Sequence, residues 1–473
     1  MSKPLPIAII GAGPVGLAAL AHLLERGENP IAFESGDAIG ANVRAWAHIR
    51  MFSPWTYTVD SATVRLLEPS GWKMPPTDDL PTGDELRNNY LLPFAALPQV
   101  RDRIHLNASV VAISRRNIDK MKDAGREEAP FILHIAYADG HEAIIEARAV
   151  IDASGTWNTP NPLGSGGLPA VGERAQSAHI FYGIPDIGGT EASRYANKRV
   201  MVVGSGHSAI NALLELVKLQ TRYPQTQAIW VMRRENLTRV YGGAENDGLT
   251  ARGQLGSRIQ AHVEAGAIQL ITPFSVCEIQ RIGDDLSVKG ETPQGIREVT
   301  VDEVIATTGA RPNLDMLREL RLDLDPSLES PRVLGPMIDP NIHSCGSVPP
   351  HGETELRQPE KDFYIVGMKS YGRAPTFLLA TGYEQVRSVA AALVGDWQAA
   401  QDVQLQLPET GVCSTDLDGN GGSCCSSVTN TVAVVPTLQL INFDSITLNV
   451  PILQSVEIEN SVRDCGCDST CCS

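Results

Sequence analysis

The chain has 473 residues, of which 42% are hydrophobic and 20% are charged, and its formal net charge at pH 7 is −16. A chain of this length exceeds what one hydrophobic core supports and predicts two or three domains. The acidic balance argues against nucleic acid and against an anionic membrane surface as the main partner, so neither is expected to be bound.

The first apolar stretch, residues 5–24, is almost uncharged and nearly long enough to span a bilayer. It lacks the cleavage-site pattern of a signal peptide, and three glycines and a proline interrupt it. We therefore interpret this stretch as part of a folded domain of a cytoplasmic protein. A membrane anchor or a signal peptide is the disfavoured alternative.

The glycines of this stretch have the spacing of a dinucleotide-binding turn. A β-branched run, IAII, precedes Gly11, Gly13 and Gly16, and a helical pattern follows from Leu17 to Arg26. In such a turn the first glycine bends the chain, the second lets the backbone approach a pyrophosphate, and the third allows close helix packing. A second apolar run ends at Glu34, where a carboxylate would bind ribose hydroxyls. The pattern predicts a dinucleotide site.

A second turn of the same kind begins at Gly204. A strand-like run precedes Gly204 and Gly206, and Ala209 stands where a third small residue is needed. The next run, AIWVMRR, ends in Arg233 and Arg234 instead of a carboxylate. A positive pair suits the 2′-phosphate of NADPH, although a solvated basic strand end is the alternative. The two turns together favour FAD at the first site and NADPH at the second.

Two connecting stretches are also duplicated. Residues 149–161 and 303–313 each place an apolar run before a turn of small residues, with Gly155 in one and Gly309 in the other. Such turns let the backbone pass close to a bound cofactor or between domains.

The duplicated motifs resemble the two-dinucleotide-binding-domain flavoproteins, which include group B flavin monooxygenases and disulfide reductases. The resemblance covers roughly residues 5–400 and implies an α/β fold of two Rossmann-like domains. It implies an FAD-binding domain at 1–165 and 331–400, interrupted by an NADPH-binding domain at 166–330. Residues 361–393 match the returning FAD segment, with a strand that ends at Gly367 and a helix from about Thr381 whose N-terminus would face the flavin.

Five local strings carry a closer resemblance: GGLPAVGE, YGIPDIGG, VVGSGHSAINALL, NIHSCGSVPPHG and MKSYGRAPTFLLATGYEQVRS. They are similar to the flavin-binding monooxygenase-like proteins encoded in bacterial arsenic-resistance operons. The resemblance implies an FAD- and NADPH-dependent oxidoreductase with a small-molecule substrate and an arsenic- or thiol-related task. Trivalent arsenic or another thiophilic species is therefore a candidate partner. The resemblance fixes neither the substrate nor the oligomeric state.

The cysteines bear on the class of flavin chemistry. A disulfide reductase of this fold needs a cysteine pair against the flavin, but only Cys277 and Cys345 precede residue 400. A monooxygenase needs no such pair, yet the Baeyer–Villiger pattern F-x-G-x-x-x-H is incomplete, because residues 173–175 read Glu-Arg-Ala ahead of His179. A monooxygenase-like oxidoreductase is favoured. The alternatives are an NADPH-dependent reductase that uses C-terminal cysteines as an electron relay, and a non-enzymatic metalloid-binding flavoprotein.

No catalytic residue is fixed, but three are candidates. His343 and Cys345 lie with His351 in a loop rich in glycine and proline, which could carry soft ligands into the site, although simple packing is the alternative. Arg373 could hold the flavin pyrimidine edge or a substrate anion, and a structural ion pair is its alternative reading.

The resemblance also implies which residues surround the cofactors. Residues 44–55 resemble the loop that lies over the flavin in these monooxygenases, with apolar core as the alternative. The residues expected to bind FAD are Gly11, Gly13, Pro14, Gly16, Glu34, Ser35, Trp46, Met51, Phe52, Ser53, Val110, Ala153, Ser154, Gly155, Gly367, Met368 and Thr381. Those expected to bind NADPH are Gly204, Gly206, His207, Ser208, Arg233, Arg234, Thr308 and Gly309.

The C-terminal segment, residues 408–473, differs in composition from the rest and holds most of the cysteines. Residues 437–459 alternate as strands do and are compatible with a β-hairpin. The cysteines do not follow zinc spacing, but paired thiolates suit a soft metal or As(III). Incidental thiols on a flexible segment and thiol–disulfide exchange with the flavin stay open. The candidate ligands are Cys413, Cys424, Cys425, Cys465, Cys467, Cys471 and Cys472.

Overall fold

The computed structural model describes residues 4–235, 250–342, 348–375 and 377–405. These residues belong to one compact unit that extends to Asp416, and a second unit comprises Leu417–Ser473. His343, Cys345, the expected hairpin at 437–459 and the seven C-terminal cysteines lie outside the described residues.

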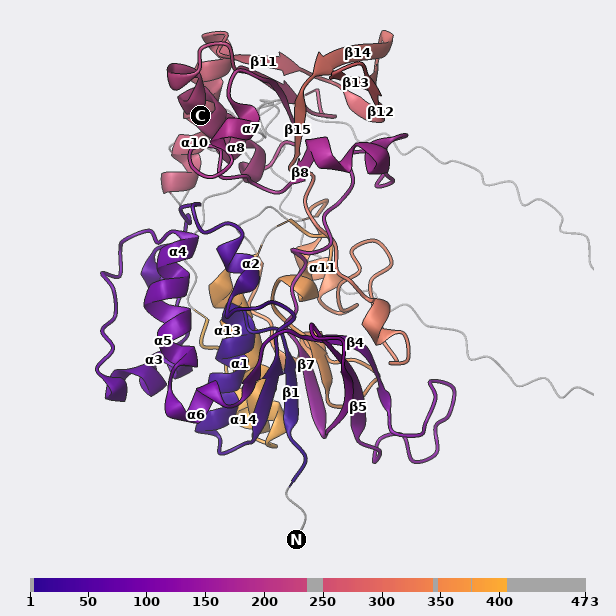
Figure 1. Ribbon diagram of the computed structural model, residues 1–473. Coiled ribbons are helices and arrows are strands. Elements are labelled where there is room, and N and C mark those ends of the chain that lie inside the picture. Colours follow the sequence, from indigo (N-terminus) through magenta and orange to yellow (C-terminus); the bar gives the residue numbers. More distant parts are fainter. Residues whose placement is uncertain (1–3, 236–249, 343–347, 376, 406–473) are drawn as a thin grey trace, which may run out of the picture. The chain divides into compact units, whose positions relative to one another are not determined.

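The first sheet contains five parallel strands in the order β16-β7-β1-β2-β3 (Figure 1). Four of them come from the N-terminal part of the chain, and the fifth returns from beyond residue 360. The bounds are β1 (Ile7–Ile10), β2 (Pro30–Phe33), β3 (Ile104–His105), β7 (Ala149–Asp152) and β16 (Phe363–Ile365).

The strands of this sheet are apolar on both faces because a layer covers each face. Ile7 and Ile9 of β1 share a buried cluster with residues of α1 (Pro14–Glu25) and α13 (Leu379–Leu393). Ala8 and Ile10 share another with an antiparallel sheet, which consists of β4 (Ala108–Arg115), β5 (Phe131–Tyr137) and β6 (Glu142–Ala147). Shorter helices complete this half: α2 (Ala41–Arg44), α3 (Ser61–Leu67), α4 (Gly83–Leu86), α5 (Leu92–Ala95), α6 (Pro98–Arg101), α11 (Gly335–Ile338), α12 (Glu353–Leu356) and α14 (Trp397–Gln401).

The second sheet repeats this layering with the strand order β11-β10-β9-β15-β8, again parallel. Val200 and Val202 of β9 pack with α8, whereas Met201 and Val203 pack with a second antiparallel sheet. The elements are α7 (Ala192–Tyr195), β8 (Ile180–Tyr182), β9 (Arg199–Val203), α8 (His207–Arg222), β10 (Gln227–Val231), α10 (Thr250–Glu264), β11 (Ile268–Ile271) and β15 (Glu303–Ala306), with β12 (Ser275–Ile282), β13 (Asp285–Thr292) and β14 (Gly295–Val301) in the antiparallel sheet. The predicted fold of two Rossmann-like halves, the first interrupted by the second, is confirmed.

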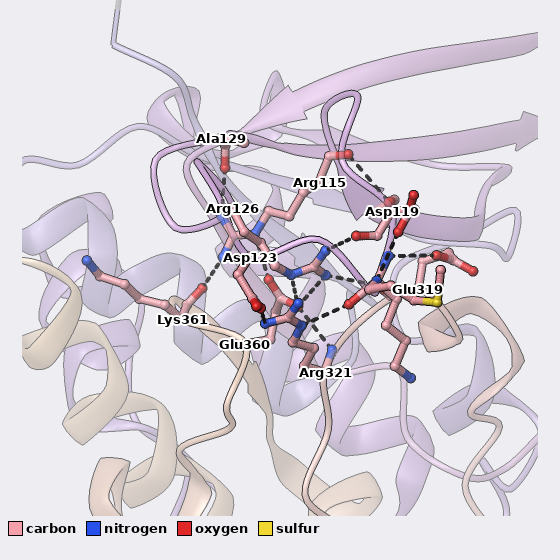
Figure 2. Close-up of polar contacts among 12 residues, drawn as sticks. Arg115, Asp119, Asp123, Arg126, Ala129, Glu319, Arg321, Glu360 and Lys361 are labelled. Carbon is pink, nitrogen blue, oxygen red and sulfur yellow. Dashed lines mark hydrogen bonds and ion pairs between the residues drawn. The ribbon is translucent and has the colours of Figure 1, made fainter. Parts of the chain in front are cut away.

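The segment after β15 packs with the first half earlier than the sequence suggested. Leu317 and Leu320 are buried in the same cluster as β4–β6, although residues up to 330 were assigned to the inserted domain. An ion cluster reinforces this packing: Arg126 donates to the carbonyl of Glu319, and the backbone N–H of Arg321 donates to Glu360 (Figure 2). Long-range packing of this kind leaves no local composition change, so the sequence did not mark it.

The two connections between the halves contact each other. Asn161 and Thr308 exchange hydrogen bonds of 2.6 and 3.1 Å, and Pro160 forms a bridge with Ala310. The turns at Gly155 and Gly309 both have positive φ, 69° and 85°. The expectation that these duplicated turns carry the chain between domains agrees with this geometry.

Within the described ranges, no helix is both long and apolar enough to cross a membrane.

Candidate functional site

A cavity of about 720 Å³ lies at the carboxyl ends of the strands of the first sheet. Every residue that was expected to bind FAD lines this cavity except Gly16 and Thr381. The contributing stretches are the turn after β1, the end of β2, the loop at 46–53, the turn after β7 and the turn after β16. The sequence prediction therefore brought together segments as far apart in the chain as Gly11 and Met368.

The first glycine turn has the geometry that its spacing predicts. Gly11 has a φ of 99°, and a Cβ there would lie 2.8 Å from the carbonyl oxygen of Ala153. A Cβ on Gly16 would lie 2.0 Å from the carbonyl oxygen of Gly11, so Gly16 serves helix packing and does not line the cavity. A Cβ on Gly13 would meet open space, which is the cavity itself.

The start of α1 is suited to a diphosphate. Gly13 is the N-cap residue and offers no side chain to the N–H groups of the first turn, which therefore remain for an anion. Glu34 lines the cavity, and its carboxylate accepts hydrogen bonds from the N–H groups of Ala12 and Gly36, both at 2.8 Å. These bonds fix the carboxylate beside the turn and leave it lone pairs for ribose hydroxyls. The residues present thus fit FAD.

The loop at 46–53 contributes both to the cavity lining and to the apolar core, the two alternatives that the sequence left open. Trp46, Met51, Phe52 and Ser53 line the cavity. Trp46 and Met51 also pack against the core of the first half, and Phe52 packs against the core of the second. The Phe52 ring lies 5.2 Å from the ring of His207, the first residue of α8.

The second glycine turn repeats the geometry of the first. Gly204 has a φ of 141°, and a Cβ there would lie 2.5 Å from the carbonyl oxygen of Thr307. Gly206 is the N-cap of α8, again without a side chain for the first turn, and a Cβ there would meet open space. Ala209 is buried as the third small residue. His207 and Ser208 line the same cavity as the FAD residues, so the start of α8 borders it.

The other residues expected to bind NADPH do not line this cavity. Arg233 and Arg234 are exposed beyond the end of β10, as an outer phosphate site requires, and one N–H of Arg233 donates to the carbonyl of Ser165 at 2.5 Å. Thr308 and Gly309 belong to the connection that contacts Asn161. The role of these four residues in NADPH binding stays a prediction.

Two expected contacts with the cavity are corrected. Helix α13 begins at Leu379, so that Leu378 and Leu379 line the cavity while Thr381 is buried inside the first turn. Arg373 forms the structural ion pair that was its alternative, with Nε 2.7 Å from Glu329 Oε2, and it does not line the cavity. The half-buried Glu329 carboxylate thus serves as the partner of Arg373.

The histidines at 351 and 179, near two of the sequence motifs, are bonded to other groups of the protein. His351 is buried, its Nδ1 lies 3.0 Å from the carbonyl of Pro349, and its Nε2 lies 2.9 Å from Gln385 Nε2. Burial lowers the pKa of His351, so the ring is neutral. His179 contacts Glu303 and Arg281. Within the described residues, no cluster of three or more His, Cys, Asp or Glu could hold a metal ion.

Sequence reasoning missed Lys369, a buried charged residue of the cavity lining. Its ammonium lies 2.6 Å from Asp152 Oδ2, and both side chains are almost fully buried. The signal was present, because Lys369 is a lone charge in the otherwise apolar run YIVGMKSYG and Asp152 ends the apolar run AVID. Further residues of the lining without a prediction are Arg50, Trp157, Asn158, Asn211, Asn313, Met316, Phe377, Leu378 and Leu379.

Solved structures share the fold of this chain. Bacillithiol disulfide reductase from Bacillus cereus is 19% identical, with 85% of this chain and 100% of that chain covered and a TM-score of 0.60. Ornithine hydroxylase from Pseudomonas aeruginosa is 16% identical, with 84% and 100% covered and a TM-score of 0.55. Thioredoxin reductase from T. acidophilum is 15% identical, with 83% and 100% covered and a TM-score of 0.51. At these identities the likeness concerns the fold alone.

A search of curated proteins found no match to this sequence. The family model described as pyridine nucleotide-disulphide oxidoreductase matches residues 5–346. Members of that family use FAD and NAD(P)H, the two kinds of cofactor that the duplicated glycine turns predicted. With both turns, the parallel sheets and the cavity in place, the chain belongs to the pyridine nucleotide-disulphide oxidoreductase family.

Proposed function

We propose that this protein is an FAD- and NADPH-dependent oxidoreductase whose acceptor reacts directly in the cavity, as in a flavin monooxygenase. The observation that carries the proposal is the composition of the cavity wall. No cysteine is among the described residues that line it. Cys277 is the free thiol of the described residues; it lies on β12, where its Sγ is 3.4 Å from the carbonyl of Lys289. Burial raises the pKa of Cys277, which disfavours the reactive thiolate.

The chain supplies binding, orientation and exclusion of water. The uncapped N–H groups at the start of α1 would hold the diphosphate, and the Glu34 carboxylate would bind the adenosine ribose. Apolar side chains of Trp46, Met51 and Phe52 would cover the reactive end and keep water from it. When bound, FAD would take a hydride from NADPH and pass two electrons to the acceptor.

The preference for NADPH rests on charge. Arg233 and Arg234 are exposed beyond β10, where the first half has Glu34 at the corresponding strand end. A guanidinium pair at this position suits a 2′-phosphate and provides no acceptor for a free 2′-hydroxyl.

The proposed physiological task is detoxification of arsenic or of another thiophilic species. Its support is the similarity of five local strings to proteins of arsenic-resistance operons, together with the seven cysteines beyond residue 412. Vicinal thiolates are the ligands that soft centres such as As(III) prefer. Under this proposal the protein acts in the cytoplasm on a small molecule.

Oxygen dependence tests the proposed reaction. NADPH oxidation by the purified holoprotein is measured in air and under nitrogen, with and without arsenite and low-molecular-weight disulfides. A direct reaction in the cavity predicts turnover that requires oxygen and is accelerated by the true substrate. Equal turnover without oxygen, when a disulfide is present, would contradict it.

A second candidate is an NADPH-dependent reductase, which the family membership favours. In this case Cys345 or the C-terminal cysteines, which lie outside the described residues, would relay electrons. Truncation after residue 407 and the substitution Cys345→Ser separate the two candidates. Loss of NADPH turnover with FAD still bound would favour the reductase, whereas unchanged turnover would favour direct reaction in the cavity. Arsenite binding by the truncated protein, compared with the full chain, tests the proposed metalloid site.

A further inference from the structure

Lys369 and Asp152 form an ion pair at the wall of the cofactor cavity. Lys369 Nζ lies 2.6 Å from Asp152 Oδ2 and 3.1 Å from Ser154 Oγ, and the two charged side chains are 1% and 0% exposed. Lys369 and Ser154 line the cavity, whereas Asp152 does not. The ammonium is therefore the charge that this pair presents to the cavity.

Stability alone does not account for the pair. Removing two charges from water is so unfavourable that a buried ion pair is often no more stabilising than a well-packed apolar pair. The pair joins β7 to the helical turn that follows β16, and β7 and β16 are already paired along their backbones. A role toward a ligand of the cavity explains the pair better.

One N–H group of the Lys369 ammonium has no acceptor among the described residues. A lysine ammonium carries three N–H groups, and within the described residues Lys369 Nζ has two acceptors. Neither acceptor can shift away freely, because Asp152 Oδ1 accepts from both the N–H and the hydroxyl of Ser154, at 3.1 and 2.6 Å. The ammonium is thus held at a fixed place, with one N–H left for a group in the cavity.

Other parts of the lining also favour negative charge in the cavity. The short helical turn η7 (Gly367–Tyr371), which carries Lys369, is bonded to α13 through Gly367 N–H and Gln385 Oε1 at 2.7 Å. Helix α13 has 15 residues, and its uncapped N-terminus lines the cavity at Leu378 and Leu379. Of the described residues that line the cavity, only Glu34 has a carboxylate, and that group is engaged at the first glycine turn.

We propose that Lys369 contacts bound FAD and binds the reduced cofactor more strongly than the oxidised one. Transfer of a hydride from NADPH leaves NADP⁺ and reduced FAD with one added negative charge, and no proton is released. A buried ammonium next to that charge stabilises it, because the surrounding dielectric is low. Lys369 therefore raises the reduction potential of the flavin, and Asp152 moderates the effect while it positions the ammonium.

Two variants of the holoprotein test this proposal: one removes both charges of the pair, and the other removes only the charge of Asp152. The double variant Lys369→Met/Asp152→Asn removes both charges and leaves no unpaired ion. Its preference for reduced over oxidised FAD should fall roughly tenfold, which corresponds to a midpoint potential about 30 mV lower for a two-electron couple. Asp152→Asn alone keeps the ammonium and should shift the potential in the opposite direction. Potentials are measured by equilibrium with redox dyes, and FAD dissociation constants by titration of the apoprotein.

Opposite shifts in the two variants would support the proposal, because a purely structural role moves both in the same direction. A double variant with the potential and the FAD affinity of the parent protein would overturn it. Equal weakening of oxidised and reduced FAD would also overturn it, since Lys369 would then bind the cofactor without distinguishing its redox states. The control is Glu360→Gln, which alters a buried ion cluster that does not line the cavity and should leave the potential unchanged. If Asp152→Asn does not fold, the double variant alone decides.

Discussion

Two buried ion clusters in the first half of the molecule, one around Glu360 and one formed by Lys369 and Asp152, differ in what their charges face. In the Glu360 cluster, Arg115 and Arg126 both bind the Glu360 carboxylate, and other N–H groups of the two guanidiniums donate to the carbonyls of Ala129, Lys361, Asp119 and Glu319 (Figure 2). In the Lys369–Asp152 pair, Lys369 belongs to the cavity lining, and within the described residues its ammonium has two acceptors for three N–H groups.

This difference separates a structural ion cluster from one that faces a ligand. The Glu360 cluster ties together three segments, 115–129, 319–321 and 360–361, and both of its guanidiniums bind the Glu360 carboxylate away from the cavity. The Arg115 Cζ atom also lies 3.6 Å from the centre of the Phe131 ring, so that an aromatic face covers this guanidinium. Burial by itself therefore does not indicate function, whereas burial combined with an unused donor at a cavity does.

The largest effect is expected from removal of Glu360. Glu360→Ala leaves Arg115 and Arg126 buried without a counter-charge, so the free energy of unfolding should fall by about 3–5 kcal/mol. Urea unfolding followed by circular dichroism measures this loss. Asp315→Asn, which breaks the exposed pair with Arg318, is the control and should leave the unfolding midpoint nearly unchanged. A stable Glu360→Ala protein would show that the cluster is not structural.

The next largest effect is expected from Gly13→Ala, which should weaken FAD binding without reducing the stability of the protein. Gly13 has a φ of −82°, which alanine adopts without strain, and the added methyl group enters the cavity where the diphosphate would lie. FAD affinity should fall at least about a hundredfold, or roughly 2.7 kcal/mol, while the apoprotein keeps its stability. Absorbance of retained flavin and titration of the apoprotein measure the loss.

Gly206→Ala is the matched control, because Gly206 has the same conformation and the same open surroundings in the second turn. This variant should bind FAD normally and NADPH weakly. Tight FAD binding by Gly13→Ala would refute the assignment of the first turn.

An intermediate effect is expected at the exposed cations of the second half. The double variant Arg233→Ala/Arg234→Ala should raise the KM for NADPH by roughly ten- to a hundredfold, since an ionic hydrogen bond contributes about 1.5–3 kcal/mol. The KM for NADH should change little, and so should stability, because both side chains are exposed. An equal change in both KM values would place the 2′-phosphate elsewhere.

The smallest effect is expected in the pH dependence of the stabilisation that Glu360 provides. Burial favours the protonated form of Glu360, but hydrogen bonds from Arg126 and Arg115 outweigh it and hold the pKa of Glu360 below its ordinary value. The stabilisation is therefore complete above the pKa of an unfolded glutamate, roughly 4.3, and is lost as pH falls through the lower folded value. The difference in unfolding free energy between the parent protein and Glu360→Gln should be constant from pH 7 to 5 and shrink below about pH 4. A difference that grows on acidification would contradict the assigned charge state.

The features that the sequence predicted well are local. The two glycine turns, their strands and helices, and the cavity residues that follow strand ends all lie within short stretches whose spacing has a steric reason. The ion clusters were not predicted, because Asp152 is 217 residues from Lys369 and Arg115 is 245 residues from Glu360. Only packing brings such partners together, and no local spacing records it. Arg373 illustrates the same limit, since its partner Glu329 lies 44 positions away.

The return of β16 to the first sheet has a consequence for synthesis on the ribosome. The inserted sheet uses strands from Ile180 to Ala306 and is complete once that stretch has left the exit tunnel. The first sheet must wait for Phe363–Ile365, and the helix that covers β1 together with α1 follows only at Leu379–Leu393. Domains generally fold as units while the chain emerges, so the second half of the molecule should fold before the first. Until then the nascent chain exposes the apolar face of α1, and the FAD site cannot close.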